Sequence, residues 1–178
     1  MLKTRHACGF TLVELMIGLA IVAILMFSAI PSYTAWMQNT KIRNAADAVL
    51  NGLQLARAEA IQRNTNVQFV VAADSGWSVS VVAPAQVVQT RTAGQGSAGV
   101  IATMTPGAAT TVTFNALGRV VANADGSASI SEVTFDVSAA TLPATLTREL
   151  RVTVSPAGRA RMCDPGVTEP TDIRNCVS

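Results

Sequence analysis

Gly9-Phe10-Thr11-Leu12-Val13-Glu14 begins an apolar segment that continues to Ile30 and follows a short basic leader, residues 1–9. The 21 residues from Phe10 to Ile30 contain one charged side chain, Glu14. About 20 apolar residues, rising roughly 1.5 Å each, are enough for a helix to cross a bilayer. An acidic side chain within such a helix costs about 2.5–3.5 kcal/mol on insertion. We therefore expect a membrane-spanning helix in which Glu14 has a partner or a function.

The leader, the Gly9–Phe10 junction, the acidic residue and the apolar helix resemble the N-terminus of the type IV pilin superfamily, which includes prepilins and the pseudopilins of type II secretion. The resemblance implies that a prepilin peptidase cleaves between Gly9 and Phe10 and that Phe10 becomes N-methylated. It also implies that Glu14, then the fifth residue, meets the N-terminal amine of a neighbouring subunit. Two charges that are each unfavourable in lipid are offset when paired, and assembly provides the partner.

Three other interpretations of this N-terminus fit the sequence less well. A secretory signal peptide is disfavoured by the charge inside the apolar run and by the lack of a small-x-small cleavage site. A lipoprotein signal around Cys8 is disfavoured because the apolar run follows the cysteine. A simple single-span anchor explains the length of the apolar run but does not explain why an acidic residue, Glu14, lies within it.

The composition favours a structural protein over an enzyme. Of the 13 Lys and Arg residues, Lys3 and Arg5 lie in the leader, so 13 − 2 = 11 basic residues balance 11 acidic ones in the cleaved chain. This neutral balance gives no global argument for nucleic-acid binding. Cleavage also removes the one histidine, which excludes a Ser-His or Cys-His pair, and we expect no metal site and no cofactor.

An α+β fold is expected, with one long N-terminal helix packed on a C-terminal domain of antiparallel β-sheets. The helix should extend from about Phe10 to Gln62, with a kink or loosening at Pro31. Its second half has an apolar stripe at alternating spacings of four and three residues, which indicates packing on a sheet. The stripe comprises Ile42, Ala46, Val49, Leu53, Ala56 and Ala60. The expected parts are a cleaved leader (1–9), a transmembrane or filament-core helix (10–31), an amphipathic continuation (32–64) and a β-rich domain (65–178).

The β-rich domain is expected to contain eight strands, separated by turns rich in Gly, Asp and Asn. They are Asn66–Ala73, Gly76–Ala83, Gln86–Thr92, Thr110–Asn115, Arg119–Ala122, Ile130–Val137, Arg148–Ser155 and Arg159–Cys163. The glycine-rich segment Ala93–Gly99 is expected to be a flexible loop.

Two segments of this region carry a second resemblance. Thr113-Phe114-Asn115-Ala116-Leu117-Gly118-Arg119 and Val154-Ser155-Pro156-Ala157-Gly158-Arg159 are similar to the paired signatures of GspH/FimT-type minor pilins and pseudopilins. The resemblance implies a filament subunit made as an inner-membrane protein, with one span and its globular domain in the periplasm. Its implied partners are the prepilin peptidase and other major and minor pilins or pseudopilins. Whether the filament is a pilus or the pseudopilus of a type II secretion system stays open.

The C-terminal region concentrates arginine. Gly158-Arg159-Ala160-Arg161 resembles the DNA-binding motif of FimT-type pilins that act in natural transformation. Arg148 and Arg151 lie on the preceding expected strand and, with Gly158, Arg159 and Arg161, complete a candidate DNA-binding set of five residues. The resemblance implies that Arg159 and Arg161 contact the phosphates of double-stranded DNA without reading sequence. The alternative is a purely structural subunit in which these arginines form surface ion pairs, with Glu149, Asp164 and Glu169 as available partners.

Two cysteines remain after cleavage, Cys163 and Cys176. In an oxidising compartment we expect them to form a disulfide that closes a C-terminal loop, and two free thiols are the alternative.

Overall fold

The computed structural model describes residues 10–176, so the leader and the predicted cleavage at Gly9 lie outside the described chain. Within these residues the chain forms one helix, α1 (Leu12–Arg63), followed by nine strands. The strands are β1 (Val67–Val71), β2 (Trp77–Val81), β3 (Gln86–Arg91), β4 (Val100–Thr105), β5 (Thr111–Phe114), β6 (Val120–Val121), β7 (Glu132–Val137), β8 (Leu150–Val154) and β9 (Ala160–Cys163). The chain divides into two compact units, one ending at Trp36 and one beginning at Met37. This division lies inside the predicted 32–64 segment.

Helix α1 begins with an N-cap. The Thr11 Oγ1 accepts a hydrogen bond of 3.2 Å from the backbone N–H of Glu14. The helix includes Pro31, and the Thr34 hydroxyl donates to the Pro31 carbonyl at 2.8 Å. The local loosening at Pro31 stays a prediction. In its first half α1 is long and apolar enough to cross a membrane.

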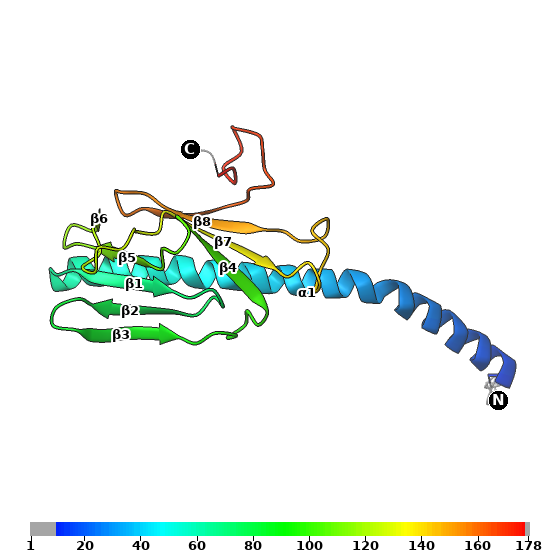
Figure 1. Ribbon diagram of the computed structural model, residues 1–178. Coiled ribbons are helices and arrows are strands. Elements are labelled where there is room, and N and C mark those ends of the chain that lie inside the picture. The colour runs from blue at the N-terminus through cyan, green and yellow to red at the C-terminus, as the bar shows by residue number, and fades with distance from the viewer. Residues whose placement is uncertain (1–9, 177–178) are drawn as a thin grey trace, which may run out of the picture. The chain divides into compact units, whose positions relative to one another are not determined.

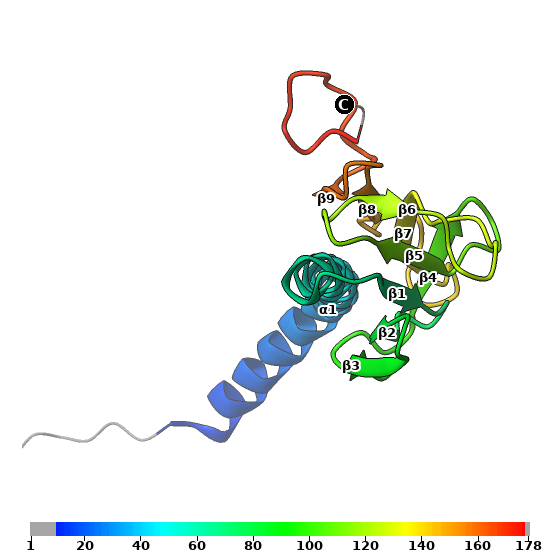
Figure 2. The ribbon, with the colours of Figure 1, turned by 90° about the vertical axis from the view of Figure 1, so that its left-hand side faces the viewer.

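The second unit consists of residues 37–63 of α1 and two antiparallel sheets (Figures 1 and 2). The five-stranded sheet has the order β3-β2-β1-β5-β6, and the four-stranded sheet has the order β4-β7-β8-β9. The expected α+β architecture is therefore confirmed.

The core lies between the helix and the inner faces of the two sheets. All six residues of the predicted stripe on α1 are 0–1% exposed, which confirms that the stripe packs in the core. The core also contains large side chains from both sheets, including Phe69, Phe114 and Phe135, which are fully buried. Alternating burial along β1, β2 and β7 matches the period of two expected for a sheet with one buried face.

Strand β4 was not predicted. It follows the glycine-rich segment that was expected to be a flexible loop, and it pairs with β7 along its whole length. Its buried residues Val100 and Ala102 alternate with the exposed Ile101 and Thr103, so the period of two is present. The signal is weak because a small alanine and two threonines replace the large apolar residues that mark the other strands.

Candidate functional site

The unit formed by residues 10–36 presents apolar side chains on all sides. Those that are exposed include Phe10, Leu12, Val13, Leu15, Met16, Ile17, Leu19, Ile21, Val22, Ile24, Leu25, Met26, Phe27 and Ile30. Their exposed fractions range from 46% at Val22 to 84% at Phe27. A helix that is apolar on every side is stable in lipid or among other apolar helices, and exposes a large unfavourable area in water.

Glu14 is the one acidic residue of this apolar unit. Its backbone N–H is held by the Thr11 N-cap, but its carboxylate forms no ion pair or hydrogen bond with any residue from 10 to 176. The carboxylate is therefore available to a positive group from outside the chain.

The first signature segment forms a tight turn between β5 and β6. The Asn115 N–H donates to the Arg119 carbonyl at 2.9 Å, and the Gly118 N–H donates to the Asn115 carbonyl at 2.8 Å. The Asn115 Oδ1 accepts from the N–H groups of Leu117 and Arg119, both at 3.0 Å. Gly118 has φ +70°, a backbone conformation that favours glycine.

The second signature segment forms the same turn between β8 and β9. The Ser155 N–H donates to the Arg159 carbonyl at 2.9 Å, and the Gly158 N–H donates to the Ser155 carbonyl at 2.8 Å. The Ser155 hydroxyl replaces the asparagine side chain and accepts from the Arg159 N–H at 3.2 Å. Gly158 has φ +78°. The two signatures are therefore equivalent hairpin turns, one in each sheet, and each places an arginine directly after its glycine.

The two turns pack against each other and against α1. A Cβ added at Gly158 would lie 1.9 Å from the Gly118 carbonyl oxygen, so that position has no room for a side chain. The Val120 N–H donates to the Pro156 carbonyl at 3.1 Å, and the Arg57 Nε on α1 donates to the Gly118 carbonyl at 3.0 Å. A glycine at this position can let the backbone turn or approach a ligand closely. It does make the turn, but the close approach is to Gly118.

The five residues of the proposed DNA-binding set do not form one surface of free positive charge. Arg151 is paired with Glu132 (Nε to Oε1, 3.2 Å) and Glu149 (Nη2 to Oε1, 3.4 Å). Arg161 donates to the Asn175 carbonyl at 2.7 Å. Both arginines are thus engaged inside the protein, which agrees with the structural alternative for these two residues.

Arg148 and Arg159 remain exposed, and their guanidinium groups make no ion pair or hydrogen bond within the described part of the chain. Arg148 precedes β8, where the Asn39 Oδ1 accepts from its backbone N–H at 2.8 Å. Arg159 belongs to the second turn and not to β9. Arg119, which was not included in the predicted set, is exposed in the same way on the first turn. The equivalence of the two signature glycines was the sequence signal that could have identified it.

Cys163 and Cys176 form a disulfide. It closes a C-terminal loop that is attached to the end of β9, where the Asp164 N–H donates to the Arg174 carbonyl at 2.7 Å. Within the loop, hydrogen bonds from Arg174 lower the pKa of Asp172 to about 2.

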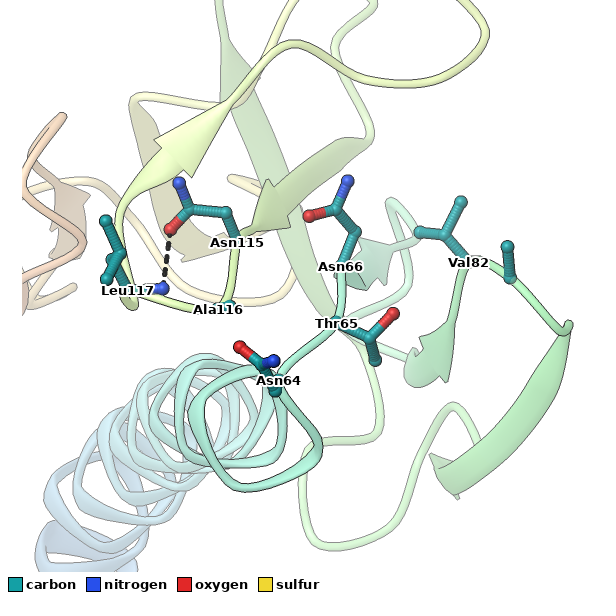
Figure 3. Close-up of a pocket in the computed structure, with 8 residues that line it drawn as sticks. Asn64, Thr65, Asn66, Val82, Asn115, Ala116 and Leu117 are labelled. Atoms are coloured by element: carbon teal, nitrogen blue, oxygen red, sulfur yellow. Dashed lines mark hydrogen bonds between the residues drawn. The ribbon is translucent and has the colours of Figure 1, made fainter.

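A pocket of about 350 Å³ lies beside the first turn (Figure 3). It is lined by polar side chains of the segment between α1 and β1, by the β2–β3 connection, and by the turn itself. The lining residues are Asn64, Thr65, Asn66, Val82, Ala83, Asn115, Ala116 and Leu117. This lining has no titratable group, and residues 10–176 contain no cluster of His, Cys, Asp and Glu that could hold a metal ion.

Comparison with known proteins identifies the family. Residues 45–158, more than half of the chain, match the family of the type II transport protein GspH. The chain belongs to the GspH family. Residues 4–30 of this GspH-family protein also match the prokaryotic N-terminal methylation motif. Membership of the type IV pilin superfamily, predicted from the N-terminus and the paired signatures, is confirmed.

Solved structures share the fold. The type IV minor pilin FimU of Pseudomonas aeruginosa aligns with a TM-score of 0.50 and 22% identity, over 71% of this chain and 91% of FimU. The minor pseudopilin EpsH of the type II secretion system of Vibrio cholerae aligns with a TM-score of 0.50 and 18% identity, over 71% of this chain and 99% of EpsH. No curated protein sequence matches the chain significantly. The GspH-family protein is thus a minor pilin or pseudopilin of a type IV pilus or a type II secretion system.

Proposed function

We propose that this protein is a minor pilin held in the inner membrane and then incorporated into a type IV pilus through residues 10–36. The observation that carries the proposal is the apolar surface of this unit, exposed on every side. Such a surface is stable in a bilayer or in a bundle of similar helices. It therefore supports both the membrane-bound form and the form assembled in the filament. The disulfide supports a periplasmic position for residues 37–178. A pseudopilus is the alternative destination, because the same helix would serve there.

Glu14 directs assembly in this proposal. The peptidase cleaves the Gly9–Phe10 bond, and the Glu14 carboxylate pairs with the methylated amine of Phe10 in a neighbouring subunit. The free carboxylate supports this role, since pairing removes the cost of an isolated charge in an apolar environment. A competing role is local, because Thr11 and Glu14 have the spacing of a helix capping box.

Two variants of the full-length protein separate these roles. Glu14→Gln removes the charge and keeps the shape, whereas Thr11→Ala removes the N-cap and keeps the charge. Immunoblots of washed membranes and of sheared pili measure insertion and incorporation. We expect both variants in the membrane and a loss of incorporation for Glu14→Gln alone. Equal incorporation of Glu14→Gln and wild type would refute the pairing, and an equal loss in both variants would indicate a capping role. If wild-type protein is absent from sheared pili but needed for secretion, the pseudopilus is favoured.

A second candidate function is capture of DNA for uptake. Arg119 and Arg159 favour it, because their exposed guanidinium groups have no partner among residues 10–176 and lie on equivalent turns that pack against each other. Arginine in this setting suits phosphate, and two such contacts would give weak binding without sequence preference. Arg151 and Arg161 would contribute only after their present partners were released.

Binding of duplex DNA to the detergent-solubilised full-length protein tests this candidate at several salt concentrations. Arg159→Gln should weaken binding and reduce the slope of log affinity against log salt by about 1. The matched control is Arg43→Gln, which removes the same charge from an exposed site on α1. Equal binding by the two variants, or no binding by wild type, would refute DNA capture and leave only the structural role.

A further inference from the structure

The two sheets have four edge strands, and three of these edges are short or bonded to another part of the chain. Strand β6 has two residues. The outer edge of β4 is occupied where the Ala102 N–H donates to the Ala73 carbonyl at 2.8 Å. The end of β9 is occupied where the Asp164 N–H donates to the Arg174 carbonyl. Covering of this kind is how soluble proteins prevent unwanted strand pairing.

Strand β3 is different. It has six residues, and every side chain in it is exposed or half-exposed, with Val87 at 66%. Apart from its pairing with β2, no backbone hydrogen bond reaches it from residues 10–176. Figures 1 and 2 show β3 as the outermost strand of its sheet, with no segment of residues 37–176 alongside its outer edge.

The hydrogen bonds of β2 define which backbone groups of β3 face outward. The Ala72 N–H donates to the Gly76 carbonyl at 2.8 Å, so the Gly76 backbone faces β1. Because successive residues of a strand alternate, Trp77 and Val79 direct their backbone groups toward β3. Their partners in β3 are Arg91 and Gln89, which therefore face inward. Thr90 lies between these two partners, and its N–H and C=O face outward.

Val87 is a second outward-facing residue. It lies opposite Ser80, whose backbone faces β1 by the same alternation. The register shifts between Val79 and Ser80, and this bulge accommodates Val88 as the extra residue of β3. The free edge thus offers the backbone donors and acceptors of Val87 and Thr90 beside an exposed valine side chain.

Most features that normally protect an edge are missing from β3. The strand contains no lysine and no proline, and its one charged residue is Arg91. The Arg91 guanidinium donates to the Gln95 carbonyl, and lies 3.4 Å from the Ser75 carbonyl and the Ser97 hydroxyl. It is therefore directed toward the protein's own loops and does not repel an approaching strand.

We propose that the outer edge of β3 pairs with an extended strand of a neighbouring filament subunit, which adds a sixth strand to the five-stranded sheet. This inference rests on the proposed assembly into a filament, which brings sheet-containing subunits together. Main-chain hydrogen bonds to Val87 and Thr90 provide the contact, and an extended backbone is the chemistry that matches such an edge. The edge has no free charge, so its partner strand needs no complementary charge.

Hydrogen–deuterium exchange of the full-length protein tests this pairing directly. Exchange of residues 86–92 is compared between protein in membranes and protein in purified filaments, with mass spectrometry of the fragments. The Val87 and Thr90 amides should exchange about tenfold or more slowly in filaments, because a strand pairing protects outward amides. Thr90→Pro removes one outward N–H and leaves the inward pairs of Gln89 and Arg91 intact, so it should reduce incorporation. Thr90→Val is the matched control that keeps this N–H, and it should incorporate normally.

Each outcome has a separate meaning. Wild-type protein present in filaments with unchanged exchange at residues 86–92 would overturn the strand pairing and leave the proposed function standing. Protection of the Asp47 region of α1 to the same extent would mean general burial and would also overturn it. Absence of wild-type protein from every filament would overturn the proposed function and this inference together. Equal incorporation of Thr90→Pro and Thr90→Val would contradict a pairing that uses the Thr90 N–H.

Discussion

The contact between the two signature turns predicts that alanine substitution lowers the free energy of unfolding by different amounts at three glycines. These three glycines share one backbone conformation. Gly118, Gly126 and Gly158 have φ of +70°, +74° and +78°. Alanine in this left-handed region costs about 1–2 kcal/mol at any of them. The three positions differ in what the added Cβ would meet, so they separate backbone strain from packing.

Gly158→Ala should be the most destabilising of the three. Its Cβ would lie 1.9 Å from the Gly118 carbonyl oxygen, a backbone atom held by Arg57 and by the turn, so the two sheets must move apart. Overpacking of this kind costs about 1–3 kcal/mol, which gives a total of about 2–5 kcal/mol. At Gly118 the nearest atoms are Ile61 Cδ1 at 2.8 Å and Arg57 Nε at 2.9 Å, which are side-chain atoms that can shift. At Gly126 no atom lies within 4 Å of the added Cβ, so Gly126→Ala should cost only the backbone strain of the left-handed conformation.

Urea unfolding of the full-length protein in detergent measures these differences. Trp77 is 7% exposed in the core and reports unfolding of the second unit by fluorescence. With an m-value of about 2 kcal/mol/M, Gly158→Ala should lower the midpoint by about 1–2.5 M, and Gly126→Ala by about 0.5–1 M. Equal midpoints for these two variants would show that the contact between the turns is loose, and would refute the packing argument. A Gly118→Ala midpoint below that of Gly158→Ala would refute the ranking.

Three further predictions concern the helix contact and the C-terminal loop. Arg57→Ala removes the hydrogen bond from α1 to the first turn and should cost about 1–3 kcal/mol in the same unfolding assay, with Arg57→Lys recovering part of it. Replacing Cys163 and Cys176 together by serine should cost about 3 kcal/mol by the chain-entropy account, and adding reductant to wild type should have the same effect on its unfolding midpoint. Hydrogen bonds from Arg174 lower the pKa of Asp172 to about 2 from an ordinary 3.8, so the loop gains stability above about pH 4 and loses it as the pH falls toward 2. An NMR titration of the Asp172 carboxyl with a midpoint near 3.8 would contradict that pairing.

The parts of the fold that follow a strict period were predictable. The stripe on α1 repeats at helical spacing in large and small apolar residues alike, so its burial could be derived without a structure. The same is true of β1, β2, β7 and β8, which are rich in valine and bounded by turn residues. Strand β4 was missed because its buried face consists largely of Val100 and the small Ala102, and it begins next to a glycine-rich loop. Its pairing with β7 is a long-range contact that a local pattern does not contain.

The sequence could not predict whether each arginine side chain is paired within the protein, because pairing depends on which strands are neighbours. Arg151 meets Glu132 only because β7 and β8 pair in a register that places Arg151 opposite Thr134, two residues from that glutamate. Arg161 meets Asn175 because the C-terminal loop, closed by the disulfide and bonded to the end of β9, returns toward this strand. The sequence placed four arginines in one candidate DNA-binding set, two by motif resemblance and two by their position on the neighbouring strand. In the structure, Arg151 and Arg161 are bonded within the protein, whereas Arg148 and Arg159 have no side-chain partner among residues 10–176. The contact between the two signature turns places Arg119 and Arg159 on adjacent turns. Of the two arginines in the Gly-Arg-x-Arg motif, Arg159 could contact phosphate without local rearrangement whereas Arg161 is bonded to Asn175, so the motif does not act as a unit.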